Sequence, residues 1–304
     1  MMNLFAERLM VICMLTNDCN QACKYCSESA GCGNAERLPY EVVDQLLKDI
    51  YGISKESIIS FIGGEATIWP GFYDILKAES FKKINLRSLY TNATAISGEH
   101  IDSIRDAGFF EVRVSLDSDR QEEHDASRGN GTFHKAVSNI GLMVENDIPV
   151  TAGTVLSKSN INRLDSLIDY FKSLNLKMIH FFPLYMKDRG GSQKSLELSV
   201  EDREYISRKL EINYPSCSVA REPLCESGTW YFKVLCNGDC IVQKDRDKRK
   251  LGNLFEHRFS ELYRKAEAML KPAVISCKEC KYYDNPLLCE NMHIYCMNDL
   301  NFMV

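Results

Sequence analysis

The sequence Cys19-Asn20-Gln21-Ala22-Cys23-Lys24-Tyr25-Cys26 contains three cysteines at the spacing C-x3-C-x2-C. It follows the apolar run of residues 9–15, which predicts a buried strand. Thiolates are soft ligands that suit iron–sulfur clusters and zinc, and their close spacing lets one loop wrap around a metal centre. A cubane cluster has four irons, so three local cysteines leave one iron open to an exogenous ligand. An open iron indicates catalysis rather than a structural site.

Two other interpretations of this loop stay open. The same spacing fits three of the four ligands of a zinc site whose fourth ligand lies elsewhere in the chain. The other interpretation is that the three cysteines are unrelated core residues that happen to share a loop. Only the cluster interpretation predicts that the loop binds a second molecule.

A second motif, Gly63-Gly64-Glu65, follows the apolar strand predicted at residues 57–62. The two motifs, in this order, resemble those of the radical SAM superfamily, and the resemblance covers most of the chain. It implies that Cys19, Cys23 and Cys26 hold a 4Fe-4S cluster whose open iron is chelated by the amino and carboxylate groups of S-adenosylmethionine (SAM). One electron from the cluster would then cleave SAM and release a 5′-deoxyadenosyl radical, which abstracts hydrogen from the substrate.

The composition predicts a soluble protein with a full core. Of the 304 residues, 45% are hydrophobic and 26% charged, and the net charge of −5 gives no basic footprint for nucleic acid or an anionic membrane. No apolar run approaches the ~18 residues that a membrane span needs, and residues 1–8 carry no evident signal peptide. Thirteen cysteines without an export signal favour metal ligation in a reducing, cytoplasmic compartment over disulfides.

The hydrophobic pattern alternates between strands and helices in the first part of the chain. Strands are predicted at residues 9–15, 57–62, 84–90, 110–116, 150–156 and 178–182. Helices are predicted at residues 41–50, 70–78, 97–107, 132–145 and 161–174, and later at 200–212 and 259–270. Six strands separated by helices indicate a parallel sheet with right-handed crossovers.

This alternation gives way to short, cysteine-rich elements after a connector near residues 184–215. We therefore expect an α/β fold with three parts: a partial (β/α)6 radical SAM barrel at 1–190, a connector and helix at 191–215, and a small extension at 216–304. The β/α barrel itself is what the resemblance implies. The candidate residues follow strand ends, as at Asn92 and Asp117, which is where barrel folds place their active sites.

The resemblance also implies roles for residues around the cofactor. Tyr25 corresponds to an aromatic beside the adenine, and Glu65 to an acceptor for the amino group of SAM. Asn92 and Ser115 match positions that contact the ribose or the methionyl part, and Arg128 matches an arginine that pairs with the SAM carboxylate. The alternatives are a packing tyrosine, strand-end caps and a solvated arginine. The predicted SAM-binding set is Tyr25, Gly63, Gly64, Glu65, Asn92, Ser115 and Arg128.

The extension resembles the SPASM or twitch extension, which holds auxiliary 4Fe-4S clusters in peptide-modifying members. Trp230–Val242 predicts a hairpin with an Asn237-Gly238 turn. The predicted metal ligands here are Cys225, Cys236, Cys240, Cys277, Cys280, Cys289 and Cys296, which would hold one auxiliary cluster or two. The match is imperfect, because Gln243 stands where the family has a cysteine, and His293 stands at the place of the last one. A zinc knuckle is the alternative.

Other cysteines and histidines receive no metal role. Cys13 is predicted to be strand core and Cys32 a bystander in its loop. Four histidines show no metal spacing and are assigned no function: His100, His134, His180 and His257.

We therefore expect a radical SAM enzyme that installs a crosslink, thioether, epimerisation or oxidation in a ribosomally made peptide. A separate carrier or recognition protein and an external electron donor of the flavodoxin or ferredoxin type are the expected partners. The alternative is a radical SAM oxidoreductase acting on a small molecule or a protein, such as a dehydrogenase or a sulfatase maturase. A non-enzymatic zinc or iron–sulfur scaffold is the third hypothesis, and it predicts no SAM binding.

Overall fold

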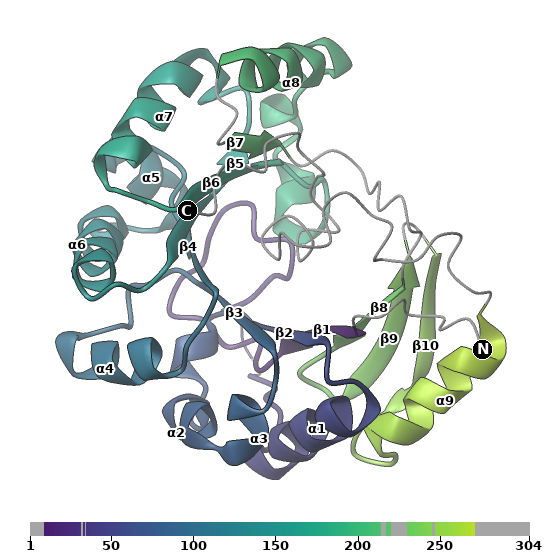
Figure 1. Cartoon of the computed structure of the whole chain (residues 1–304). Helices are drawn as coiled ribbons and strands as arrows, with labels where there is room; N and C mark the ends of the chain where they lie inside the picture. The colour runs from purple at the N-terminus through teal and green to yellow at the C-terminus, as the bar shows by residue number, and fades with distance from the viewer. Residues whose placement is uncertain are drawn as a thin grey trace.

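A computed structural model describes residues 9–31, 33, 35–213, 217–219, 230–244 and 247–270. These residues form a curved sheet with helices along its outer side (Figure 1). Its strands are β1 (Leu9–Met14), β2 (Ser57–Ile62), β3 (Leu86–Thr91), β4 (Glu111–Ser115), β5 (Val150–Leu156), β6 (Met178–Pro183), β7 (Cys217–Val219), β8 (Tyr231–Val234), β9 (Asp239–Lys244) and β10 (Asp247–Asn253). Their order across the sheet is β10-β9-β8-β1-β2-β3-β4-β5-β6-β7.

The strands from β8 through β1 to β7 pair in parallel, and successive strands of the barrel are joined by helices. The α-helices are α1 (Tyr40–Ile53), α2 (Phe72–Lys77), α3 (Glu79–Lys82), α4 (Gly98–Asp106), α5 (Gln121–Arg128), α6 (Thr132–Glu145), α7 (Leu164–Ser173), α8 (Val200–Asn213) and α9 (Phe259–Met269). Short 3-10 turns cover Ala66–Ile68, Ile161–Arg163, Asp188–Ser192 and Lys194–Leu196. The predicted parallel β/α sheet is confirmed, and it leaves the carboxyl ends of its parallel strands at one edge.

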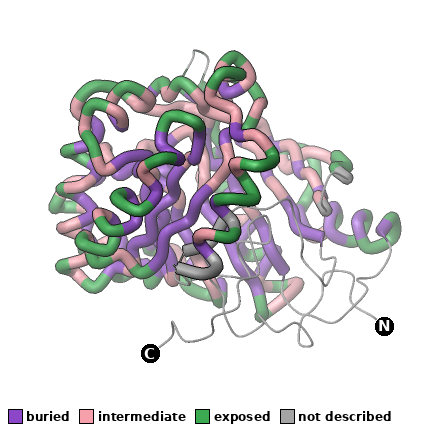
Figure 2. The backbone as a smooth tube through the Cα atoms, turned by 90° about the horizontal axis from the view of Figure 1, so that it is seen from above, coloured by how far each residue is buried: buried purple, intermediate pink, exposed green. Residues whose placement is uncertain are grey.

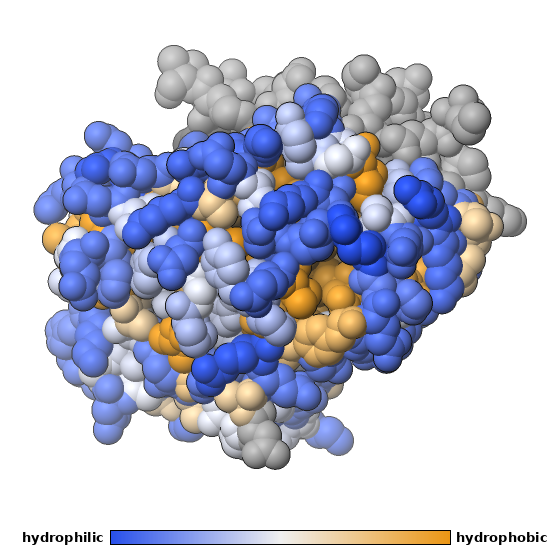
Figure 3. Space-filling model, turned by 90° about the horizontal axis from the view of Figure 1, so that it is seen from below, coloured by the Kyte–Doolittle hydropathy of each residue, from blue (hydrophilic) through white to orange (hydrophobic). Residues whose placement is uncertain are grey.

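The two faces of the sheet have different environments because successive strand residues point to opposite sides. In β1, Val11 and Cys13 belong to the large core between the sheet and the helices, which confirms Cys13 as strand core. Met10 lies on the inner side in a small cluster with Ile58 and Tyr231. Figure 2 shows the buried strands inside a layer of helices that are exposed on their outward faces. The face seen in Figure 3 is mostly hydrophilic, with apolar side chains gathered near its middle.

The described part of the extension continues the barrel sheet. Strand β8 pairs in parallel with β1, and β9 and β10 follow it as antiparallel neighbours. Helix α9 packs its buried residues, such as Phe259 and Leu262, into the same outer core as β9. The strands of the extension are thus placed beside the barrel opening, where their inward-facing side chains can reach the site.

The pattern of the sequence missed helices α3 and α5 and strands β7 and β10, and it misjudged one turn. Helix α5 buries only His124, so it lacks the apolar periodicity that marks a helix. Strand β7 is short, and β10 begins with charged residues, which is typical of edge strands. The expected β8–β9 hairpin is present, but the amide of Gly238 donates to the carbonyl of Leu235 at 2.9 Å, so Cys236 and Asn237 form the centre of the turn.

Candidate functional site

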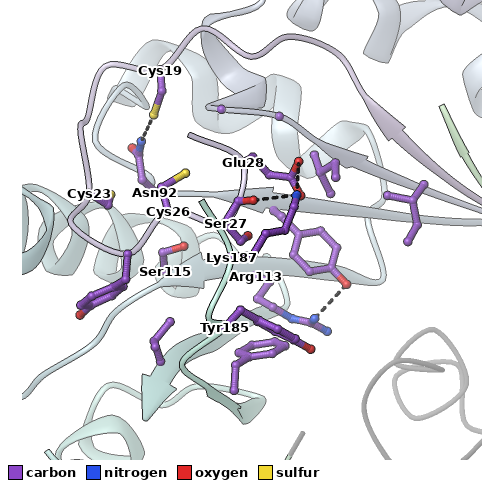
Figure 4. Close-up of a pocket in the computed structure, with 18 of the residues that line it drawn as sticks. Cys19, Cys23, Cys26, Ser27, Glu28, Asn92, Arg113, Ser115, Tyr185 and Lys187 are labelled. Carbon is purple, nitrogen blue, oxygen red and sulfur yellow. Dashed lines mark hydrogen bonds and ion pairs between the residues drawn. The ribbon is translucent and has the colours of Figure 1, made fainter. Parts of the chain in front are cut away.

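A cavity of about 560 Å³ opens at the carboxyl ends of the parallel strands (Figure 4). Side chains from β1 to β6 line it, and so do side chains from β8, β9 and β10 of the extension. The three cysteines of the first loop line the cavity together with the predicted residues Tyr25, Gly63, Gly64, Asn92, Ser115 and Arg128. The structure therefore brings together every predicted SAM-binding residue except Glu65, which lies behind the wall.

The cysteine loop has polar groups directed at two of its sulfurs. The side-chain amide of Asn92 lies 3.9 Å from Cys19 Sγ, and the guanidinium of Arg128 lies 4.0 Å from Cys23 Sγ. Burial raises the pKa of Cys19 to about 12, so the thiol stays protonated in the absence of a metal. A bound metal cation would replace the proton. These donors fit a cluster with anionic sulfurs, because hydrogen bonds to the sulfurs stabilise such groups.

Among the described residues, no three His, Cys, Asp or Glu side chains gather as they would around one metal ion. A zinc site needs its ligands at one point, whereas the thiolates of a cubane cluster each bind a different iron. Ligation of a cluster by Cys19, Cys23 and Cys26 stays a prediction of the motif.

The end of β2 is docked directly onto this loop. The amide of Gly64 donates to the carbonyl of Thr16 at 2.7 Å, and the amide of Glu65 donates to the carbonyl of Asp18 at 2.9 Å. A Cβ atom on Gly64 would lie 2.2 Å from the backbone oxygen of Asp18, and one on Gly63 would lie 2.8 Å from that of Thr16. Both glycines are thus required by the close approach of two backbones.

We expect Gly64→Ala to displace the cysteine loop and to destabilise the protein by about 1–3 kcal/mol, because the clash is with backbone that cannot rotate away. Iron content after reconstitution should fall with it. Gly141→Ala is the matched control, since Gly141 lies in α6 with nothing within 4 Å of an added Cβ, and it should be neutral or stabilising. Chemical denaturation measures both variants, and equal stabilities would contradict the close approach.

Glu65 lies behind the wall of the cavity and is held by several hydrogen bonds. Its side chain is 1% exposed, and its carboxylate accepts hydrogen bonds from the hydroxyl and amide of Thr67, the hydroxyl of Thr91 and the amide of Asn92. Burial raises the pKa of Glu65, against the effect of these four donors. These bonds let Glu65 fix the ends of β2 and β3 and the position of Asn92. Three of the donors bind Oε1 and one binds Oε2, so Oε2 keeps acceptor capacity, and a contact of Glu65 with the amino group of SAM stays a prediction.

Arg128 and Tyr25 meet at Asp117, which lies two residues after the end of β4. Arg128 donates through Nε and Nη2 to the two carboxylate oxygens of Asp117, at 2.5 and 3.1 Å, and the hydroxyl of Tyr25 donates to Oδ2 at 3.2 Å. Burial would raise the pKa of Asp117, but the Arg128 guanidinium holds it below its usual range. The arginine side chain is 11% exposed, so it is not a solvated surface residue. Its Nη1 faces Cys23, which leaves pairing with a SAM carboxylate as a prediction.

Asn92 directly follows β3, and Ser115 is the last residue of the neighbouring strand β4. Asn92 donates to the side-chain oxygen of Asn20 at 2.8 Å and accepts from Thr94, so it ties the end of β3 to the loop. Ser115 ends β4 and lines the cavity. Contacts of either residue with a cofactor stay predictions.

A buried polar network under the cavity floor escaped the sequence prediction. Arg113 donates to both carboxylate oxygens of Glu111 and, at 2.8 Å, to the hydroxyl of Tyr90. His180, which had been assigned no role, lies 3.0 Å from Glu111 through Nε2, and Thr151 donates to the same carboxylate. Residues 110–116 alternate apolar and polar side chains, and this period of two was the signal for a polar barrel interior.

The cysteines of the extension are only partly placed. Cys225, Cys277, Cys280, Cys289, Cys296 and His293 lie outside the described residues, as does Cys32. Cys236 is in the β8–β9 turn, with its sulfur 4.0 Å from a carboxylate oxygen of Glu36. Cys240 is fully buried in the outer core, and burial raises its pKa to about 12. Ligation of an auxiliary cluster by these residues stays a prediction, and Cys236 is the better placed of the two because of the apolar surroundings of Cys240.

The model of the radical SAM superfamily matches residues 14–171, which contain the cysteine loop, both glycines and β2 to β5. The chain belongs to the radical SAM superfamily. Members of this superfamily are enzymes, and the family implies a 4Fe-4S cluster with SAM at the site described above.

Relatives of this radical SAM chain have several activities. An AdoMet-dependent heme synthase of Methanosarcina barkeri (strain Fusaro / DSM 804) is 28% identical over 194 residues, covering 63% of this chain and 54% of the relative. A cysteine-type anaerobic sulfatase-maturating enzyme of Clostridium novyi (strain NT) is 22% identical over 327 residues, covering 90% and 85%. The solved structure of anSMEcpe with bound AdoMet has a TM-score of 0.69 at 20% identity, covering 91% of this chain and 84% of that one.

These comparisons establish the fold and the superfamily. The chain spans about half the length of the heme synthases that it matches. In the part of the chain that the structure describes, no helix is long and apolar enough to cross a membrane.

Proposed function

We propose that this chain reductively cleaves SAM and abstracts hydrogen from a peptide substrate to install a modification. The observation that carries the proposal is the cysteine loop docked on Gly63 and Gly64 at the edge of the cavity. A 4Fe-4S cluster held by Cys19, Cys23 and Cys26 would supply the electron for this cleavage. The other residues of the site would orient SAM between the loop and the strand ends.

The protein residues divide this work according to their surroundings. Arg128, fixed by Asp117, places a positive charge beside Cys23, where it favours the anionic form of the bound sulfurs. Asn92 is held by the backbone bond to Glu65 and directs its amide at Cys19. We propose that Tyr25 and Ser115, which line the cavity beside this group, contact the nucleoside and the methionyl part of SAM.

A peptide is the substrate class that we favour over a small molecule. The cavity continues from the cysteine loop past Tyr185, which is 53% exposed, to Gln243 and Lys248 on the extension. A cavity with walls from both the barrel and the extension can receive an extended chain through its opening. Another structure of anSMEcpe holds AdoMet and the Cp18Cys peptide, and that protein shares the fold. A separate carrier protein and a flavodoxin- or ferredoxin-type electron donor complete the proposal.

The test is anaerobic reconstitution of the chain with iron and sulfide, followed by SAM and dithionite. We expect visible absorption of an iron–sulfur cluster, about four iron atoms or more per chain, and formation of 5′-deoxyadenosine. Peptides encoded by short reading frames beside the gene are then screened for mass shifts. A preparation that holds only zinc, or one that binds iron and forms no 5′-deoxyadenosine, would overturn the proposal.

A further inference from the structure

The cavity lining has more basic than acidic residues although the chain as a whole is acidic. Six of its lining residues are basic and one is acidic: Arg113, Arg128, Lys187, Arg189, Lys233 and Lys248 stand against Glu28. The net charge of the whole chain is −5. Such a concentration of one sign in a concave, partly dry site attracts ligands of the opposite sign.

Three of the basic residues already have tasks inside the site. Arg113 is paired with Glu111 below the floor, and Arg128 with Asp117 beside Cys23. Arg189 donates a hydrogen bond to the carbonyl of Ala30 in the first loop. Burial raises the pKa of Cys23, and the charge of Arg189 acts in the opposite direction. Lys187, Lys233 and Lys248 remain, and they come from the segment after β6 and from the extension.

Glu28 lies between two of these lysines. Its carboxylate oxygens are 3.1 Å from Lys233 Nζ and 4.0 Å from Lys187 Nζ. Lys187 also contacts Asp188 at 3.1 Å and donates to the carbonyl of Ser27 at 3.0 Å. The side chains of Glu28 and Lys233 are 28% and 22% exposed, so solvent and ligands reach them. Figure 4 shows Glu28 beside Lys187 at the wall of the cavity.

The extension positions the basic residues on one inner wall. Lys233 of β8 is in register with Ile12 of β1, and both line the cavity. Lys248 of β10 is in register with Gln243, which is in turn in register with Tyr231, so these side chains form a row across the sheet. Lys233 lies two residues after Tyr231 on β8, so it shares the inner face of that strand, and Lys248 and Lys233 both line the cavity.

We propose that Lys187 and Lys233 bind a carboxylate of the peptide substrate, with Lys248 at the entrance, and that Glu28 occupies this place until the substrate displaces it. The proposal rests on the proposed function and adds to it the class of substrate, a peptide with a carboxylate near the modified residue. The group that lies between Lys187 and Lys233 in the protein, Glu28, is itself a carboxylate, so the site suits a carboxylate better than a larger anion. Two ammonium groups suit it as point charges with rotatable donors.

A purely structural ion pair would behave differently from a displaceable one. If Glu28 competes with the substrate, Glu28→Gln removes the competitor and strengthens binding of an acidic peptide. If Glu28 only holds β8 to the first loop, the same variant weakens binding of every peptide. Lys233→Met removes the binding group in either case, so the two variants together separate these roles.

The experiment measures fluorescence anisotropy with the anaerobically reconstituted protein and SAM. The probes are a labelled, C-terminally amidated peptide with internal glutamates, its glutamine counterpart, and the glutamine peptide with a free C-terminal carboxylate. We expect one of the carboxylate peptides to bind about tenfold tighter than the amidated glutamine peptide, as for one charge-assisted contact. The two carboxylate probes distinguish an acidic side chain from a chain terminus. Glu28→Gln should tighten this binding about tenfold, and Lys233→Met should abolish the preference.

Lys250→Met is the matched control, because Lys250 lies on the same strand as Lys248, pairs with Asp239 and does not line the cavity. It should leave the preference unchanged. Equal binding of all three peptides, or weaker binding by Glu28→Gln, would overturn the inference. Formation of 5′-deoxyadenosine is measured on the same preparations: its absence from the wild type overturns the proposed function, whereas its presence without a charge preference overturns only this inference.

Discussion

Cys23→Ala is expected to lose 5′-deoxyadenosine formation down to the level of a control without protein. Cys23 is the central cysteine of the loop, and its sulfur faces the guanidinium of Arg128 and donates to the side-chain oxygen of Gln21 at 3.5 Å. With two cysteines left, the loop can no longer hold three irons and keep the fourth open. Iron content and visible absorption should therefore fall with the activity.

Cys13→Ala is the control for Cys23→Ala. It makes the same chemical change in β1, on the outer face of the sheet, at a residue that is fully buried. It should retain iron and SAM cleavage and lose about 1 kcal/mol or less through the small cavity that it leaves. SAM cleavage by Cys23→Ala at the wild-type rate would mean that the loop does not hold the cluster.

The sequence predicted those parts of the site whose positions follow from local sequence patterns. The cysteine loop and Gly63-Gly64 each follow an apolar strand, and parallel strands end at one edge of their sheet. Their meeting in space therefore needed only the strand assignments and the direction of the strands. The same logic placed Asn92 and Ser115 in the cavity wall.

The sequence did not predict which partners the site residues have. The expected role of Glu65 gave no sign that Thr67, Thr91 and Asn92 donate hydrogen bonds to its carboxylate. The ion pair of Glu28 and Lys233 joins residues that are 205 positions apart. Such a contact depends on the pairing of β8 with β1, and no spacing along the chain encodes that register.

Glu111→Gln is expected to lower the free energy of unfolding by about 3–5 kcal/mol, because it leaves the buried charge of Arg113 without its partner. Glu111 is fully buried, and the side chain of Arg113 is 3% exposed. The double variant Glu111→Gln with Arg113→Met should recover part of this loss, since it removes the uncompensated charge as well. Urea denaturation of Glu111→Gln, Arg113→Met and the double variant gives their free energies of unfolding. Together with the wild type these values form a double-mutant cycle.

The same network should make the protein less stable in acid. Burial together with Arg113 lowers the pKa of His180 to about 4, whereas an unfolded histidine titrates near 6.5. Between these values the unfolded chain binds more protons, so stability falls as the pH drops from about 6.5 to about 4. Burial would raise the pKa of Glu111, but Arg113 and His180 hold it well below its usual range, so its contribution is lost at still lower pH. In Glu111→Gln the loss of unfolding free energy at the lowest pH should disappear, because the titrating carboxylate is gone. If the unfolding free energy of this variant fell with pH in the same way as that of the wild type, the assignment of the charged pair of Glu111 and Arg113 would be contradicted.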